Sequence, residues 1–330
     1  MKMTRLGGDG PEISQFGIGA MSFAGIYGDA TVDESHAVLD ACRSMGVTHI
    51  DTANVYGLGR SEEIIGSWLA ANPSARSEMH IATKAGITRS AERPFNNDPD
   101  HLEASLDASL QRLGVDHVDL FYVHRYDKAH SPEDVAGTLK RLIESGKTRA
   151  VGLSEVAPST LRRAFTECPI AAVHSEYSLS TRAPELGLTQ TCAELGATLV
   201  AFSPVGRAFL TDVPFSYARG QSMAFTKNNP RFMEPNYSAN IAATDKLREL
   251  AADMGEPTAA LAIAWLIAQG DHVLPIPGTK NLTHLSELVR GTELDLGAED
   301  IARINEILPV GWAHGDRYTT EQWLGPERYC

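Results

Sequence analysis

Short, nearly continuous apolar runs alternate along the chain with longer segments in which apolar residues recur every three or four positions. Continuous apolar runs are typical of parallel strands buried on both faces, and the longer period is typical of amphipathic helices. The runs predict strands at 16–20, 49–52, 80–84, 120–124, 150–154, 172–176, 199–203 and 273–277. The segments between them predict helices, among them 33–45, 61–70, 101–113, 132–144, 158–165 and 184–195. Strands that each precede a helix predict an α/β fold, a (β/α)8 barrel formed by residues 1–330 as a single domain.

Local signals support these helices, and two stretches fall outside the alternation. Thr31 and Glu34 form a capping-box pattern, and Pro132, Pro158 and Pro257 suit the first turn of a helix. Residues 206–236, after the seventh strand, have no clear period and many aromatic and basic side chains. Residues 309–330 form a tail rich in tryptophan and tyrosine. A long loop in a compact fold is usually functional, so we expect this loop and the tail to lie over the catalytic face.

Composition and charge narrow the function classes. Apolar residues make up 43% of the chain and charged residues 22%, which is typical of globular proteins and not of disordered chains. The net charge of −13 would repel a phosphate backbone, so we expect no nucleic-acid partner. No apolar run is long enough to span a bilayer and none follows the N-terminus, so we expect neither a membrane partner nor a secretory signal. No pattern specifies an oligomeric state.

The chain has four scattered cysteines, Cys42, Cys168, Cys192 and Cys330. They form no C-x-x-C pair, which favours reduced thiols and a cytoplasmic location.

Polar side chains stand at successive ends of the predicted strands. Asp51 follows the second strand, Lys84 ends the third, His124 ends the fourth, and Tyr56 lies five residues beyond Asp51. Any one of these could be a charge on a surface loop. Barrel enzymes build their chemistry at these strand ends, so the complementary set predicts an active site.

The set suits proton transfer to or from an oxygen atom while another group delivers hydride. A free phenol has a pKa near ~10, too high for efficient acid–base work at neutral pH. A lysine ammonium about 4 Å away would stabilise the phenolate by roughly 4 kcal/mol. We therefore expect Lys84 to lower the pKa of Tyr56, Asp51 to keep Lys84 protonated, and His124 to bind a substrate carbonyl.

Several segments closely resemble the signature of the aldo-keto reductases. They are HIDTANVYG at 49–57 with Ser61-Glu62-Glu63 and Gly66, ATK at 82–84, DLFYVH at 119–124 and GLS at 152–154, and the likeness runs from residue 6 to residue 307. The resemblance implies that Asp51, Tyr56, Lys84 and His124 form a catalytic tetrad, with Tyr56 as the general acid. It also implies reversible reduction of a small aldehyde or ketone to the alcohol, with NADPH as cofactor and NADH as an alternative donor.

The cofactor cannot use a Rossmann fingerprint, because no G-x-G-x-x-G follows a strand and no Walker A sequence is present. The resemblance places it across the fifth to eighth strands. Ser154, Glu155 and His174 would then bind the carboxamide, with Glu155 standing where asparagine and His174 where glutamine is usual. Phe202 would stack on the nicotinamide ring. The remaining expected contacts are Ser203, Pro204, Gly206 and Arg207 near the pyrophosphate, Gly278, Thr279 and Lys280 at the 2′-phosphate, and His284 and Glu287 at the adenine end.

Residues in the loops after the first and fourth strands are expected to line the substrate pocket: Met21, Phe23, Arg125 and Tyr126. No metal site is expected, since neither H-x-H nor H-E-x-x-H occurs, and Ser203 lies in no G-x-S-x-G motif. Two other functions stay open. One is a regulatory or binding protein that keeps the reductase fold, as potassium-channel β subunits do. The other is a barrel hydrolase or lyase that binds no nicotinamide.

Overall fold

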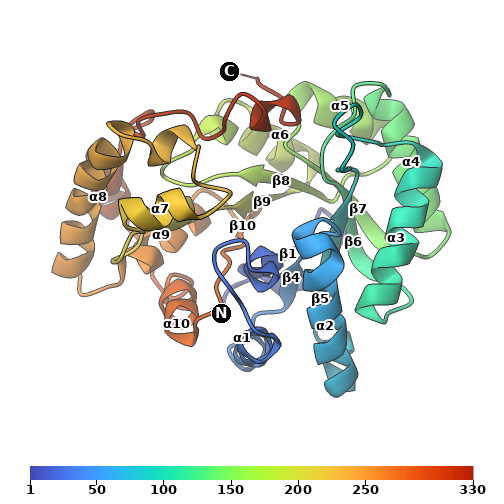
Figure 1. Ribbon diagram of the computed structural model, residues 1–330, viewed down its shortest axis with the longest axis horizontal. Helices are drawn as coiled ribbons and strands as arrows, with labels where there is room; N and C mark the ends of the chain where they lie inside the picture. Colours follow the sequence, from blue (N-terminus) through green and yellow to red (C-terminus); the bar gives the residue numbers. More distant parts are fainter. Residues whose placement is uncertain (330) are drawn as a thin grey trace.

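Eight parallel strands form the barrel in the computed structural model, which describes residues 1–329 (Figure 1). They are β3 (Gly17–Gly19), β4 (His49–Asp51), β5 (His80–Ala85), β6 (Val118–Val123), β7 (Thr148–Ser154), β8 (Ala172–Glu176), β9 (Thr198–Phe202) and β10 (Val273–Pro275). Each strand pairs with its neighbour in sequence order. The predicted strands and the (β/α)8 architecture are confirmed, with strand ends shifted by no more than two residues.

The barrel closes between its first and last strands. The Gly19 N–H donates to the Pro277 carbonyl across 2.8 Å. A Cβ atom on Gly19 would lie 2.8 Å from the Ile276 carbonyl oxygen, and one on Gly17 would lie 2.9 Å from Ile276 Cγ2. Glycine at these two positions therefore lets the strands approach closely enough to close the barrel.

Helices cover the outside of the barrel. They are α1 (Val32–Ser44), α2 (Arg60–Ala71), α3 (Pro99–Leu113), α4 (Pro132–Glu144), α5 (Pro158–Glu167), α6 (Leu188–Leu195), α9 (Thr258–Ile267), α10 (Leu282–Arg290) and α11 (Ala298–Ile307). The capping box of α1 is confirmed, since Thr31 Oγ1 accepts from Glu34 N–H and Glu34 Oε2 accepts from Thr31 N–H. Pro257 differs from expectation, because it is the residue before α9 and not part of its first turn.

Two strands and two helices were not predicted. A hairpin of β1 (Met3–Arg5) and β2 (Glu12–Ser14) precedes the barrel, and the chain after β9 forms α7 (Tyr217–Ser222) and α8 (Asn236–Asp253). No single helix within residues 1–329 is long and apolar enough to cross a membrane; α8 and α9 meet both requirements only when taken together, and a bend of 92° separates them. Cys42, Cys168 and Cys192 are buried free thiols, and Cys330 lies outside the described residues.

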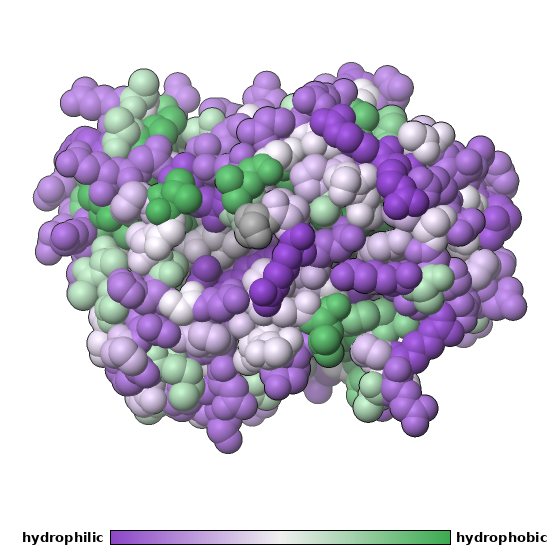
Figure 2. Space-filling view, turned by 90° about the horizontal axis from the view of Figure 1, so that it is seen from above, coloured by the Kyte–Doolittle hydropathy of each residue, from purple (hydrophilic) through white to green (hydrophobic). Residues whose placement is uncertain are grey.

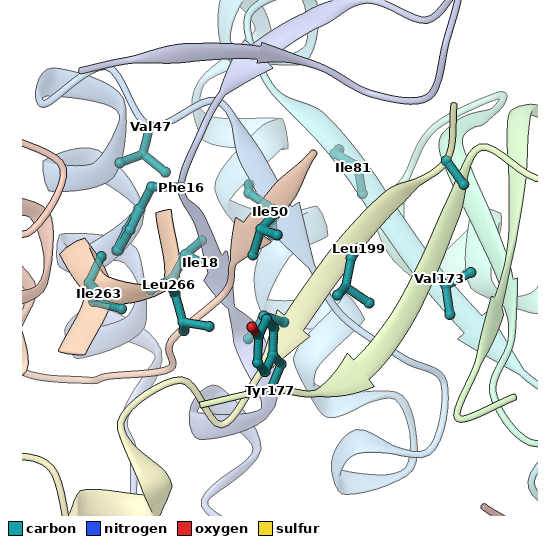
Figure 3. Close-up of a cluster of buried hydrophobic side chains, with 14 of the residues drawn as sticks. Phe16, Ile18, Val47, Ile50, Ile81, Val173, Tyr177, Leu199, Ile263 and Leu266 are labelled. Carbon is teal, nitrogen blue, oxygen red and sulfur yellow. The ribbon is translucent and has the colours of Figure 1, made fainter. Parts of the chain in front are cut away.

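The direction in which strand residues point separates core from site. Ile18, Ile50 and Ile81 point from their strands toward the helices and pack with residues such as Phe16 and Ile263 (Figure 3). Side chains alternate along a strand, so the neighbour of Ile50, Asp51, points into the barrel. The alternation thus places apolar residues between strands and helices and leaves polar residues inside the barrel at the carboxyl ends.

Candidate active site

Asp51 and Lys84 form a buried ion pair at the carboxyl ends of β4 and β5. Lys84 Nζ donates to Asp51 Oδ1 and, across 2.8 Å, to the carbonyl oxygen of Thr52. Lys84 is fully buried and Asp51 is 1% exposed. Burial favours neutral forms, but the charge of Lys84 holds the pKa of Asp51 below its usual range, and the nearby His174 acts in the same direction. The carboxylate therefore stays ionised at neutral pH.

Tyr56 and His124 lie beside this pair. The Tyr56 ring meets the His124 ring edge to face with centroids 5.8 Å apart, and Lys84 Nζ lies 5.3 Å from the centre of the Tyr56 ring. Tyr56 opens the turn η2 (Tyr56–Gly59), in which Gly57 and Gly59 adopt φ of 58° and 96°. That left-handed turn directs the tyrosine back over the barrel. The structure thus brings the four predicted side chains together.

The protonation states differ from the expectation at one point. Burial raises the pKa of Tyr56, the Asp51 carboxylate raises it further, and Arg125 lowers it only in part. Lys84 donates to Asp51, and with that pairing the pKa of Tyr56 stays above its ordinary value instead of falling below it. The pKa of His124 lies well below its usual value through burial and the nearby cations. At neutral pH the site therefore presents a protonated phenol and an uncharged imidazole.

His174 connects this group to the next strands. Its Nε2 lies 3.6 Å from Asp51 Oδ1, its Nδ1 lies 3.2 Å from Ser154 Oγ, and its ring stacks on Phe202 at 4.7 Å. Several buried polar atoms here have no hydrogen-bond partner within residues 1–329: Asp51 Oδ2, Tyr122 OH, His124 Nδ1 and His174 Nε2. Buried polar groups are nearly always satisfied, so these atoms fit a polar ligand at this place.

Some of the residues expected to bind the nicotinamide and the pyrophosphate lie close together in the structure. Ser154, His174 and Phe202 lie together, as their contacts show. After β9, Ser203 and Gly206 adopt φ of 51° and 58°, in a turn that also contains the buried Pro204. Backbone in this region is strained for residues other than glycine, and such strain is common at ligand sites.

Anion-binding features gather at the start of α10. Thr279 Oγ1 accepts from the Asn281 N–H at 3.0 Å, and Asn281 caps the helix by accepting from the His284 N–H at 3.1 Å. Lys280 directly precedes this cap, and His284 is exposed in the first turn. The positive end of the helix and an ammonium at one place fit a phosphate. Glu287 is half-buried one turn further along α10, and Gly278 packs against the Gly19 carbonyl.

Two residues expected to contact the cofactor instead form ion pairs within the chain. Glu155 accepts from Arg317 Nη1 and Nη2 at 3.1 and 2.5 Å and from the Glu176 N–H at 2.8 Å. Arg207 donates to Glu176 Oε2 at 2.7 Å and to the Arg317 carbonyl at 2.9 Å. Both side chains are buried in ion pairs that attach the C-terminal tail, so the structure does not leave these side chains free for the cofactor, and their contact with it stays a prediction.

The cluster of Glu155, Glu176, Arg207 and Arg317 confirms that the tail lies over the catalytic face. It also contains functional residues that the sequence did not predict. Arg317 and Glu176 were not predicted, although Glu176 ends a strand as Asp51 does. The tail crosses the carboxyl face of the barrel (Figure 1). Seen from above, this side of the molecule is largely hydrophilic, with hydrophobic residues in small separate groups (Figure 2).

The expected substrate residues divide into two pairs. Phe23 is fully buried in the core, and the Tyr126 hydroxyl donates to the His130 carbonyl of its own loop while its ring packs in the same core. Both side chains pack in the core, so the structure does not bring them to the mouth with the other two, and their role in substrate binding stays a prediction. Met21 and Arg125 are half-buried at the barrel mouth.

Comparisons with known proteins agree with this geometry. The sequence model of the Aldo/keto reductase family matches residues 15–309. The chain belongs to the aldo-keto reductase family. It is 36% identical to aldo-keto reductase yakc of Schizosaccharomyces pombe, whose name includes NADP(+), over 93% of this chain and 92% of that protein. It is 35% identical to the probable aldo-keto reductase 1 of Glycine max, over 95% and 91% of the two chains.

Solved structures of the family share the fold. The glycerol dehydrogenase AKR11B4 from Gluconobacter oxydans superposes with a TM-score of 0.81 at 27% identity, over 93% of this chain and 94% of that one. The thermostable aldo-keto reductase Tm1743 superposes with a TM-score of 0.73, also at 27% identity, over 93% of this chain and all of that one. These matches confirm the predicted family and barrel.

Proposed function

We propose that this aldo-keto reductase reduces an aldehyde or ketone to the alcohol, reversibly, with NADPH as the preferred cofactor and NADH as an alternative. The observation that carries the proposal is the protonated Tyr56 beside an uncharged His124 and the Lys84–Asp51 pair, at the carboxyl end of the barrel. A relative named for NADP(+) supports the choice of cofactor.

The cofactor supplies the hydride when bound. Ser154 and His174 would hold its carboxamide, and the exposed part of Phe202 would lie against its ring. Lys280 and the first turn of α10 would hold the 2′-phosphate. We assign the side chains of Glu155 and Arg207 no direct contact with it, since each is ion-paired with another residue of the chain.

The protein's own residues control the proton. Tyr56 gives its hydroxyl proton to the carbonyl oxygen as negative charge develops there. Its raised pKa keeps the proton in place until that moment. The neutral His124 hydrogen-bonds the same oxygen and orients the carbonyl. Lys84, held by Asp51, then stabilises the phenolate that remains.

A steady-state assay tests the proposal. The purified protein is mixed with NADPH or NADH and with a panel of aldehydes and ketones, and loss of nicotinamide absorbance is followed for the wild type and for Tyr56→Phe. We expect turnover that depends on Tyr56. Cofactor binding without turnover of any carbonyl compound would instead support a binding or regulatory protein, and no cofactor binding would overturn both functions.

A further inference from the structure

Arg125 is the side chain at the barrel mouth that is not accounted for by the fold. It follows His124 directly and is half-buried. Its Nη1 donates to the His124 carbonyl at 2.7 Å and to Ser154 Oγ at 3.2 Å. Within residues 1–329, its Nε and Nη2 atoms have no hydrogen-bond partner. One edge of the guanidinium is therefore available.

Arg125 also has no carboxylate of residues 1–329 within ion-pair distance, although its charge acts on Glu155 from further away. Every other arginine of the described chain that is buried or half-buried has a carboxylate oxygen within 4.0 Å. The unpaired Nε and Nη2 atoms of Arg125 are not among the fully buried unpartnered atoms of residues 1–329, so a ligand at the barrel mouth can reach them.

The charges around the mouth point the same way. The carboxylates there are Asp51, Glu155 and Glu176, with Asp316 and Glu327 of the tail nearby, and the cations are Lys84, Arg125, Arg207, Arg231 and Arg317. Lys84, Arg207 and Arg317 each pair with a different carboxylate. Arg231 lies 3.6 Å from Glu176, whereas Arg125 acts on Glu155 only from beyond ion-pair distance.

We propose that the carbonyl substrate carries a carboxylate and that Arg125 binds it. This inference rests on the proposed function and adds the substrate class. A guanidinium matches a carboxylate with two parallel N–H donors, and the unused edge of Arg125 offers such a pair. Arg125 adjoins His124 and acts electrostatically on Tyr56, so an anion bound there places a carbonyl group of the same molecule near the phenol.

Matched substrates isolate the charge. In 4-carboxybenzaldehyde and methyl 4-formylbenzoate the reacting aldehyde is the same, and only the first carries a negative charge. The measured quantity is kcat/KM for the acid divided by kcat/KM for the ester, in the wild type and in three variants. Arg125→Met keeps the apolar stem that packs near Gly325, Arg125→Lys keeps the charge, and Arg303→Met removes an exposed arginine of α11 as the control.

We expect the wild type to favour the acid. Arg125→Met should lower the acid-to-ester ratio roughly 10- to 100-fold, the range for a hydrogen bond to a charged group. Arg125→Lys should restore part of the ratio, and Arg303→Met should leave it unchanged. Calorimetric binding of the product 4-(hydroxymethyl)benzoate to the NADP-loaded protein should weaken in Arg125→Met by a similar factor.

Other outcomes overturn the inference. If Arg125 only positions Ser154, Arg125→Met will lower kcat/KM for both substrates equally and leave the ratio constant. If Arg125 binds a phosphate of the cofactor, the variant will weaken NADPH binding with the ratio again unchanged. Turnover of the ester in preference to the acid by the wild type would refute the substrate class while leaving the proposed reduction intact. Turnover of no carbonyl compound at all would refute the proposed function itself.

Discussion

Replacing Arg317 by methionine tests whether the tail is attached by its buried ion pair. The variant removes two charge-assisted hydrogen bonds to Glu155, at 3.1 and 2.5 Å. At about 1.5–3 kcal/mol each, their loss amounts to about 3–6 kcal/mol. Breaking a buried pair by removing one partner typically costs about 3–5 kcal/mol, and we expect a loss of unfolding free energy in that range.

The size of this loss should depend on pH. Burial alone would raise the pKa of Glu155, but the charge of Arg317 holds it below its ordinary value. In the wild type, the pair therefore stabilises the fold above the pKa of an unfolded glutamate, about 4.3, and this stabilisation is lost as the pH falls below it. Without Arg317 burial dominates, the pKa rises, and protonation relieves the buried charge. The difference between the two proteins should therefore shrink from pH 7 toward pH 4.

Urea denaturation at pH 7 and pH 4.5 measures the effect, and hydrogen exchange of peptides from residues 312–329 shows whether the tail detaches before the barrel unfolds. Arg328→Met is the matched control, because Arg328 is an exposed tail cation that stacks on Trp323 at 4.3 Å. A loss below about 1 kcal/mol at pH 7, or one no larger than that of the control, would show that the pair does not hold the tail.

Three further predictions concern the proton donor, the cofactor and acid stability. Tyr56→Phe should lower turnover at least ~10²-fold while the dissociation constant of NADPH stays nearly constant; more than half of the wild-type rate at saturation would remove Tyr56 from the mechanism. Lys280→Ala should weaken NADPH by roughly 1–3 kcal/mol and NADH hardly at all, and equal weakening would show that Lys280 does not bind the 2′-phosphate. Burial lowers the pKa of His49 to about 3 and of His80 to about 4, so stability should fall as the pH drops from about 6.5 toward 4. His80→Gln should remove up to about 3 kcal/mol of that fall in urea denaturation, and an unchanged pH dependence would contradict the reasoning.

The barrel and the tetrad could be predicted because both depend on order along the chain. A run such as 172–176 is apolar whatever it packs against, and the ends of parallel strands meet at one face. Asp51, Lys84 and His124 stand at such ends, so their meeting follows from topology alone.

Contacts that depend on side-chain direction could not be predicted. Phe23 lies in a loop at the mouth, but it points into the core. Glu155 meets Arg317 across more than 160 positions of sequence, and no local pattern encodes that pairing. The net direction of the Tyr56 pKa differs from the expectation for a related reason: the proximity of Lys84 was predictable, but burial of the phenol and the Asp51 carboxylate raise the pKa.

We expect the barrel to open between β3 and β10 more readily than between other neighbouring strands. The other neighbouring strands share paired registers, whereas within residues 1–329 these two are linked through the bond from the Gly19 amide to the Pro277 carbonyl just beyond β10 and, further along, by Ser22 Oγ donating to the Thr279 carbonyl. Above this line Lys280 reaches across to the carbonyl of Asp29 in the loop that follows β3. A cofactor bound at the start of α10 would lie over the same joint. Its binding would therefore hold together the two sides of the barrel that meet there. Hydrogen exchange of the Gly19 amide proton would accordingly report whether β3 and β10 are in contact.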